Sequence, residues 1–208
     1  MAVEYFGEVN SDGSPIASPT GEDNTGGAQI QATVVAAIQA CPGTGQMNLV
    51  SLAMYGRVGS GSGNIRIGIY RSSDGALVCQ TDTFAASSSS AWQERLAANV
   101  TWSIGTALGG GTEYKLSWAC ATDVYVSYKA GATGDLHYAA GDYSAGLPSN
   151  ISTLDGTWHG HHYIRCGVEA SSGATAINIA CTDSFALSDI VLPMRSLRVA
   201  SLEDNLEN

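Results

Sequence analysis

Short segments in which apolar and polar residues alternate are the feature that most restricts how this chain can fold. The clearest segment is 64–71, in which every second residue is an isoleucine: Ile65, Ile67 and Ile69. A spacing of two places these side chains on one face of a β-strand. The turn residues at 72–75 and the apolar segment 76–80 then predict a hairpin, with a positive φ at Gly75.

Similar segments occur along most of the chain. We expect further strands at 29–38, 48–58, 93–102, 114–120, 124–128 and 162–168, which with the first hairpin give a set of about eight strands, and one short strand at 3–8 in the N-terminal segment. The segments 114–120 and 124–128 are separated by a short break, and their aromatic residues alternate with polar ones. They predict a second hairpin with an aromatic face.

Composition supports a folded, all-β chain. Of 208 residues, 44% are hydrophobic and 13% are charged, whereas disordered chains are rich in charge. The 25 glycines, with Lys115 and Lys129 as the only lysines, disfavour a helical bundle. We expect a two-sheet antiparallel jelly-roll sandwich at 28–170, with an extended N-terminal arm at 1–27 and a short C-terminal extension at 171–208.

The net charge restricts the partners. At −10, the chain has no excess of cations to neutralise phosphates, so neither nucleic acid nor an anionic membrane surface is an expected partner. The longest purely apolar run, 34–38, is too short to cross a bilayer. The first residues carry acids instead of a basic segment followed by an apolar one, so no secretory signal is expected.

The cysteines do not form a recognisable framework. Their number is odd and no pair has the C-x-x-C spacing: Cys41, Cys79, Cys120, Cys166 and Cys181. Cys79, Cys120 and Cys166 fall in strand-like segments, where a reduced cysteine acts as a small hydrophobic residue. We therefore expect buried thiols and neither a disulfide scaffold nor a zinc ribbon.

Three of the four histidines lie in the segment 158–162. On an extended strand His159 and His161 face the same side and are the candidate metal ligands, with Asp155 or His137 as a further ligand. An exposed rim loop leading into the last strand explains the same residues without a metal. The expectation is that the chain holds no metal and no other cofactor.

Aromatic residues gather in the segment 125–162 and form the candidate ligand- or receptor-binding set: Tyr125, Tyr128, His137, Tyr138, Tyr143 and Trp158. Rings beside carboxylates are typical of surfaces that bind sugars or proteins, and the nearby carboxylates are Asp135, Asp142 and Asp155. Packing within a tyrosine-rich sheet is the alternative. A glycosidase needs two carboxylates at a defined separation, which this spacing does not establish. No catalytic residue is assigned.

Three strings carry a resemblance to a known kind of module: GNIRIGIYRSSDGALV, AWQERLAANVTW and GGGTEYKLSW. They resemble the hairpin and strands of a jelly-roll β-sandwich display module found in bacteriophage head and tail structural proteins and appended to secreted bacterial proteins. The likeness covers about residues 28–170. It implies a display or adhesion role without chemistry, and the expected lack of a secretory signal favours the phage version.

The function expected is therefore that of a non-enzymatic bacteriophage virion protein, located in the virion. A capsid decoration protein would form a homo-oligomer, with a trimer as the expected size, and would bind other capsid proteins through its arm or extension. The alternative is a tail or fibre component that binds a host surface glycan through the segment 125–162. A polysaccharide hydrolase is the third hypothesis and the least favoured one.

Overall fold

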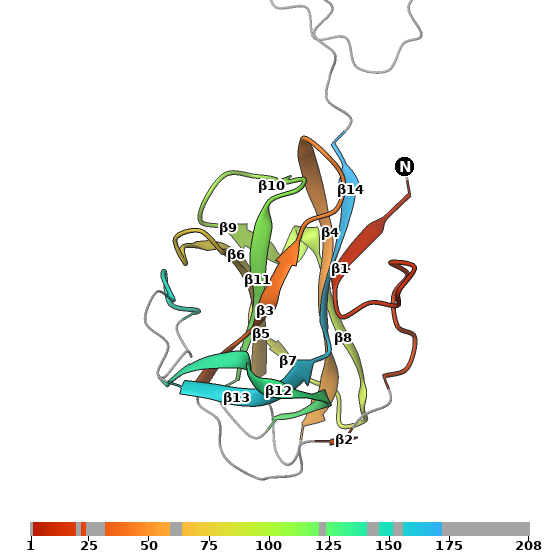
Figure 1. The fold of residues 1–208 in the computed structure, drawn as a ribbon, viewed down its shortest axis with the longest axis vertical. Coiled ribbons are helices and arrows are strands. Elements are labelled where there is room, and N and C mark those ends of the chain that lie inside the picture. The colour runs from red at the N-terminus through yellow and green to blue at the C-terminus, as the bar shows by residue number, and fades with distance from the viewer. Residues whose placement is uncertain are drawn as a thin grey trace, which may run out of the picture. The chain divides into compact units, whose positions relative to one another are not determined.

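The computed structural model describes residues 2–19, 22–23, 32–58, 64–120, 124–140, 146–151 and 156–171. These residues form an all-β fold of two antiparallel sheets, one of them curled (Figure 1). The chain divides into two units, Met1–Gly173 and Ala174–Asn208, and the second unit lies outside the described residues, as does nearly all of the expected extension at 171–208. None of the described helical residues forms a helix long and apolar enough to cross a membrane.

The first sheet is organised around one long strand, β4 (Gln46–Val58), which has partners along both edges. One edge pairs with β14 and with the start of β12, and the other pairs with β8 and β10. β1 pairs with the outer edge of β14. The remaining strands of this sheet are β1 (Glu4–Gly7), β8 (Ala91–Leu96), β10 (Leu108–Gly109), β12 (Val124–Ala140) and β14 (Ile164–Ala170).

The second sheet runs in the order β12-β3-β11-β5-β6-β9. β2 and β13 also pair with β12, and β7 pairs with β5. Its further strands are β2 (Glu22–Asp23), β3 (Ala32–Ala40), β5 (Asn64–Arg71), β6 (Leu77–Thr81), β7 (Phe84–Ala85), β9 (Val100–Trp102), β11 (Glu113–Cys120) and β13 (Gly156–His162).

β12 belongs to both sheets. Its first residues pair with β4 in the first sheet, whereas its last residues, from His137 to Ala140, pair with β3 in the second. Figure 1 shows β12 and β13 crossing one end of the sandwich formed by the other strands. A single strand thus closes this end by joining the two sheets through backbone hydrogen bonds.

The main core lies between the sheets and is made by alternate residues of each. Ile65, Ile67 and Ile69 are fully buried, which confirms the face predicted from their spacing. They pack in one cluster with residues of β4, β11 and β14: Met47, Leu52, Met54, Leu116, Trp118, Ile164, Cys166 and Val168. Burial of this many large apolar side chains supplies the main driving force for folding.

The opposite face of β5 is buried as well. Tyr70, Leu77 and Ala119 form a second cluster with Leu147 and Ile151, which come from residues 146–151. We call residues 146–151 the strap. The strap amides of Leu147 and Ile151 donate to Gln80 Oε1 (2.9 Å) and to the Gly75 carbonyl (3.0 Å).

Two further hydrogen bonds tie the strap to the sheet. Tyr70 Oη donates to the Pro148 carbonyl (2.8 Å), and the Leu77 amide donates to the Ser149 carbonyl (2.9 Å). A non-strand segment therefore covers Tyr70, Leu77 and Ala119 on the outer face of the second sheet with apolar side chains, while these four backbone groups of the strap are paired.

The first predicted hairpin is confirmed. β5 and β6 pair as antiparallel neighbours across a turn in which Gly75 has φ +69°. The Arg71 guanidinium bonds to the Asp74 carboxylate beside the turn, and this bond is the main cause that lowers the pKa of Asp74 to about 2. The short strand predicted at 3–8 is also present, as β1.

The second predicted hairpin is wrong. β11 and β12 are separated by β3 in the second sheet, and β12 begins in the first sheet, next to β4. Alternation identifies a strand but carries no information about its neighbour, because any strand with one apolar face can pair at that position. β12 is also much longer than the expected 124–128.

Two predicted single strands are each divided. The segment 93–102 contains β8, the 3-10 helix η1 (Ala97–Asn99) and β9; β8 pairs with β4, whereas β9 pairs with β6. The chain thus changes sheet at η1. The segment 162–168 spans the end of β13 and most of β14, with the break at Tyr163. In both cases the apolar pattern continues across the break, because both sheets face the same core.

The strap can be tested with a double-mutant cycle at Gly68 and Leu147. A Cβ added at Gly68 would clash with Leu147 Cδ1, so we expect Gly68→Ala to lower the free energy of unfolding by about 1–3 kcal/mol. Leu147→Ala should lower it by about 2–5 kcal/mol, because the side chain is buried. Urea denaturation measures both effects.

The double variant should lose less free energy of unfolding than the two single variants lose in sum. The difference should be about 0.5 kcal/mol or more, because removing the Leu147 side chain relieves its clash with the added Cβ. Additive losses would contradict the packing of the strap on β5.

Candidate functional site

The predicted binding residues fall mainly on two paired strands. Tyr125, Tyr128, His137 and Tyr138 lie on β12, and Trp158 lies on β13. The register places Leu136 opposite Trp158, His137 opposite Thr157 and Tyr138 opposite Gly156, with irregularities nearer the other end. The structure therefore places Tyr128, His137, Tyr138 and Trp158 in one antiparallel ladder, whereas Tyr125 pairs with Arg57 of β4. Tyr143 lies outside the described residues.

The other candidate residues are distributed around the same ladder. His159 is opposite Thr133 and His161 is opposite Lys129, so both candidate metal ligands are at register positions of β13. Asp135 lies on β12. Asp142 and Asp155 lie outside the described residues. Among the described residues, no group of three or more histidine, cysteine, aspartate or glutamate side chains could hold a metal ion.

The third histidine of the cluster, His162, belongs to the protein core. Its side chain is 3% exposed at the end of β13, next to Trp118 of β11. Trp118 Nε1 donates a hydrogen bond to His162 Nδ1 (2.8 Å), and the two rings stack with centroids 5.5 Å apart. Because Nδ1 accepts, the neutral ring carries its proton on Nε2. The bond ties the end of β13 to the centre of the second sheet.

Burial also determines the protonation of this ring. Desolvation lowers the pKa of His162 from 6.5 to about 3, so the imidazole is neutral at physiological pH. Protonation would add a hydrogen to Nδ1, which could then no longer accept the bond from Trp118. His162 therefore acts as a buried hydrogen-bond acceptor for an indole.

Four of the five cysteines are described, and all four are buried thiols that form no disulfide: Cys41, Cys79, Cys120 and Cys166. This confirms the expectation for Cys79, Cys120 and Cys166. Desolvation raises the pKa of Cys41 to about 11 and that of Cys79 to about 12, and it raises the pKa of Cys166 well above 9. A protonated, buried thiol is a poor nucleophile.

A cluster that sequence reasoning missed lies on the outer face of the first sheet. The Arg165 guanidinium carbon lies 3.9 Å from the centroid of the Trp92 ring and 5.6 Å from that of Tyr5. Tyr55 meets Trp92 edge to face, with centroids 5.7 Å apart. These residues come from β1, β4, β8 and β14, so no local spacing in the sequence could reveal them. Tryptophan, tyrosine and arginine are the residue types that dominate binding energy at protein interfaces.

The chain's own backbone occupies part of this cluster. Trp92 Nε1 donates to the carbonyl oxygen of Ile16 (2.8 Å), and Arg165 Nη1 donates to the same oxygen (3.1 Å). One carbonyl therefore receives two hydrogen bonds, one of them from a cation. Bonds from charged donors are stronger than neutral ones, so Ile16 is a firm point of attachment.

Comparisons with known proteins add no relative. The chain matches no protein-family model, and neither a search of curated proteins nor a search of solved structures finds a significant match.

The state of the thiols can be measured with Ellman's reagent on a Cys181→Ser variant, which removes the one cysteine outside the described residues. We expect no rapid reaction in the native state, because the thiols are buried and protonated. Four equivalents should react after unfolding. A thiol that reacts within seconds in the folded protein would contradict the burial of these cysteines.

The acid dependence of stability tests His162. Its pKa is lower in the folded chain than in the unfolded one, so the unfolded chain binds more protons as the pH falls from 6.5 toward 3. We expect the free energy of unfolding to fall by about 1.4 kcal/mol per pH unit below 6.5 from this group alone.

The variant His162→Gln retains a hydrogen-bond acceptor but has no imidazole, so the fall in unfolding free energy that His162 causes below pH 6.5 should vanish. The difference in unfolding free energy between the two proteins should therefore narrow by about 2 kcal/mol between pH 7 and pH 5. Chemical denaturation at several pH values measures it. A variant with the same pH slope as the unsubstituted chain would contradict a buried neutral imidazole.

Proposed function

We propose that this chain is a non-enzymatic structural protein of a bacteriophage particle, and that it decorates the capsid. The observation that carries the proposal is the use of reactive side chains for packing. The described cysteines are buried thiols, and His162 accepts a hydrogen bond inside the core. Groups that could serve as nucleophile or base thus contribute to the stability of a scaffold.

The finer fold proposed is a jelly roll. Non-sequential strands are neighbours in both sheets: β1 lies beside β14, and β3 lies between β12 and β11. Long connections that bring distant strands together are the basis of Greek-key order, and two Greek keys make a jelly roll. The resemblance of residues 28–170 to display modules of phage head and tail proteins supports the same fold and a role without chemistry.

In this role the chain forms a homo-oligomer, with a trimer as the proposed size, and binds other virion proteins. A net charge of −10 favours a partner surface with cationic groups over nucleic acid or anionic lipid. Purified particles of the phage that carries the gene test the placement. We expect the protein on the shell in near-stoichiometric ratio to the capsid subunits; its absence from intact particles would contradict the proposal.

A second candidate function is glycan binding by a tail or fibre component. It is favoured by the β12–β13 ladder, which contains Tyr128, His137, Tyr138 and Trp158, and by Tyr125, which lies on the same strand three residues before Tyr128. Aromatic rings offer sugars a stacking surface.

A glycan array distinguishes the two functions. Saturable binding that Trp158→Ala abolishes, but that the control Leu96→Ala at an exposed site on β8 retains, would favour the tail component. No binding, together with association with capsids, is expected for the decoration protein. Hydrolysis of a polysaccharide that Asp135→Asn or Asp155→Asn abolishes would contradict a non-enzymatic role.

A further inference from the structure

Residues 2–19, which we call the leading segment, lie on a surface of the rest of the sandwich. This surface, which we call the receptor, consists of the outer edge of β14 with Arg165 and Gly167, together with Tyr114 and Trp92. β1 adds four residues to the outer edge of β14, with Tyr5 opposite Gly167 and Phe6 opposite Cys166. The ladder is extended by a hydrogen bond from the Glu8 amide to the Ile164 carbonyl (2.8 Å). Without the leading segment, β14 would be an edge strand with unpaired backbone groups, which is a template for another strand.

The receptor also selects side chains. Phe6 is 4% exposed and belongs to the main core, where its ring lies 6.3 Å from that of Tyr114. Gly167 leaves room for Tyr5, because a Cβ there would lie 3.1 Å from Tyr5 Cε1 and 3.1 Å from Ser51 Oγ. The core slot that holds the Phe6 ring and the space that Gly167 leaves for the Tyr5 ring make the receptor specific for this segment.

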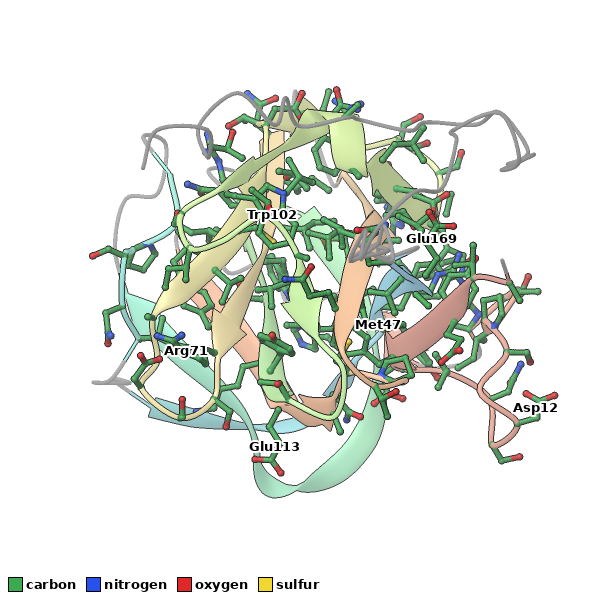
Figure 2. All side chains as sticks on the ribbon, turned by 90° about the horizontal axis from the view of Figure 1, so that it is seen from above. Asp12, Met47, Arg71, Trp102, Glu113 and Glu169 are labelled. Atoms are coloured by element: carbon green, nitrogen blue, oxygen red, sulfur yellow. The ribbon has the colours of Figure 1, made fainter. Side chains whose placement is uncertain are left out.

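A second point of attachment lies ten residues beyond Phe6. As described above, Trp92 and Arg165 both donate to the Ile16 carbonyl. Between the two points the chain forms its own turn, in which the Asn10 amide donates to the Ser14 carbonyl (2.9 Å) and the Gly13 amide donates to Asn10 (2.9 Å). Figure 2 shows Asp12, within this turn, standing out from the side of the sandwich.

The leading segment is therefore attached at two places, the β1–β14 pairing with the slot for Phe6 and the Ile16 carbonyl. Phe6 is its only buried side chain, and its other described residues are exposed or half-buried. All the contacts that it makes with the receptor would form again, unchanged, if the segment came from another copy of the chain. Exchange of identical elements between subunits is for this reason a low-cost route to oligomers.

We propose that the leading segments are exchanged between copies of this chain, so that the β1 strand of one subunit pairs with β14 of its neighbour. The occupant of the receptor is thus a second copy of residues 2–19. The exchange joins subunits through the sheet itself and through the slot for Phe6. It does not depend on a role in the virion, since it uses only contacts within this chain.

A disulfide trap tests the exchange directly. Phe6→Cys places a thiol opposite the native Cys166, and cross-strand partners have the Cα spacing that a disulfide needs. Unlabelled and isotopically heavy chains are unfolded, mixed in equal amounts, refolded together in a glutathione buffer and digested. Mass spectrometry then identifies the peptides that join residues 6 and 166.

Exchange predicts linked peptides with one light and one heavy member, at a fraction that rises with protein concentration toward about half, the value for random pairing of subunits. Only light–light and heavy–heavy links, at every concentration, would overturn the proposal. The control carries Cys166→Ser together with Phe6→Cys and should give no such link.

A second trap preserves Phe6, in case its loss prevents folding. It joins the neighbouring cross-strand pair through Glu4→Cys with Val168→Cys. The same mixed-isotope links are expected, and their absence in this trap at every concentration would overturn the proposal even if the first variant does not fold.

Discussion

The structure depends on one constraint: the second sheet has apolar side chains on both of its faces. The isoleucines of β5 point into the main core, whereas Tyr70 and Ala119 lie on the other face. A sandwich covers only the inner face of each sheet, so a further segment must cover the outer face. The strap provides this cover, and its backbone is paired with the β5–β6 hairpin and with Gln80.

The first sheet is covered in a related way, with different chemistry. Its outer face carries Arg165 between aromatic rings, and the leading segment crosses it with few buried side chains. Contact on this face is made by two hydrogen bonds to the Ile16 carbonyl and by the cation–π contact between Arg165 and Tyr5, while β1 pairs with the edge of β14 and Phe6 enters the core. The leading segment is thus attached at two places that are joined by its own turn, and this arrangement underlies the proposed exchange.

Local pattern predicted much of the fold, because a period of two reports which residues share a face of a strand. Ile65, Ile67 and Ile69, the turn at Gly75 and the buried cysteines of β6, β11 and β14 could all be predicted. Strand order could not, since β3 enters between β11 and β12 from a distant part of the chain. The change of sheet at η1 was missed because both sheets face one core.

The candidate site was predictable to a lesser extent. Aromatic composition identified segments that the structure brings into one ladder. The histidine cluster was harder to interpret, because His159 and His161 lie at ladder positions of β13 whereas His162 is a core residue bonded to Trp118. The cluster of Arg165, Trp92, Tyr55 and Tyr5 comes from four strands, so only the three-dimensional fold brings it together.

The central claim, that the strap is part of the folded core, is tested most directly by hydrogen–deuterium exchange of single amides by NMR. The amides of Leu77, Leu147 and Ile151 donate hydrogen bonds between the strap and the sheet. The structure predicts that they exchange as slowly as the amides of β5, through the same global unfolding. Exchange of these three amides at the rate of an unstructured peptide, while β5 remains protected, would contradict the account.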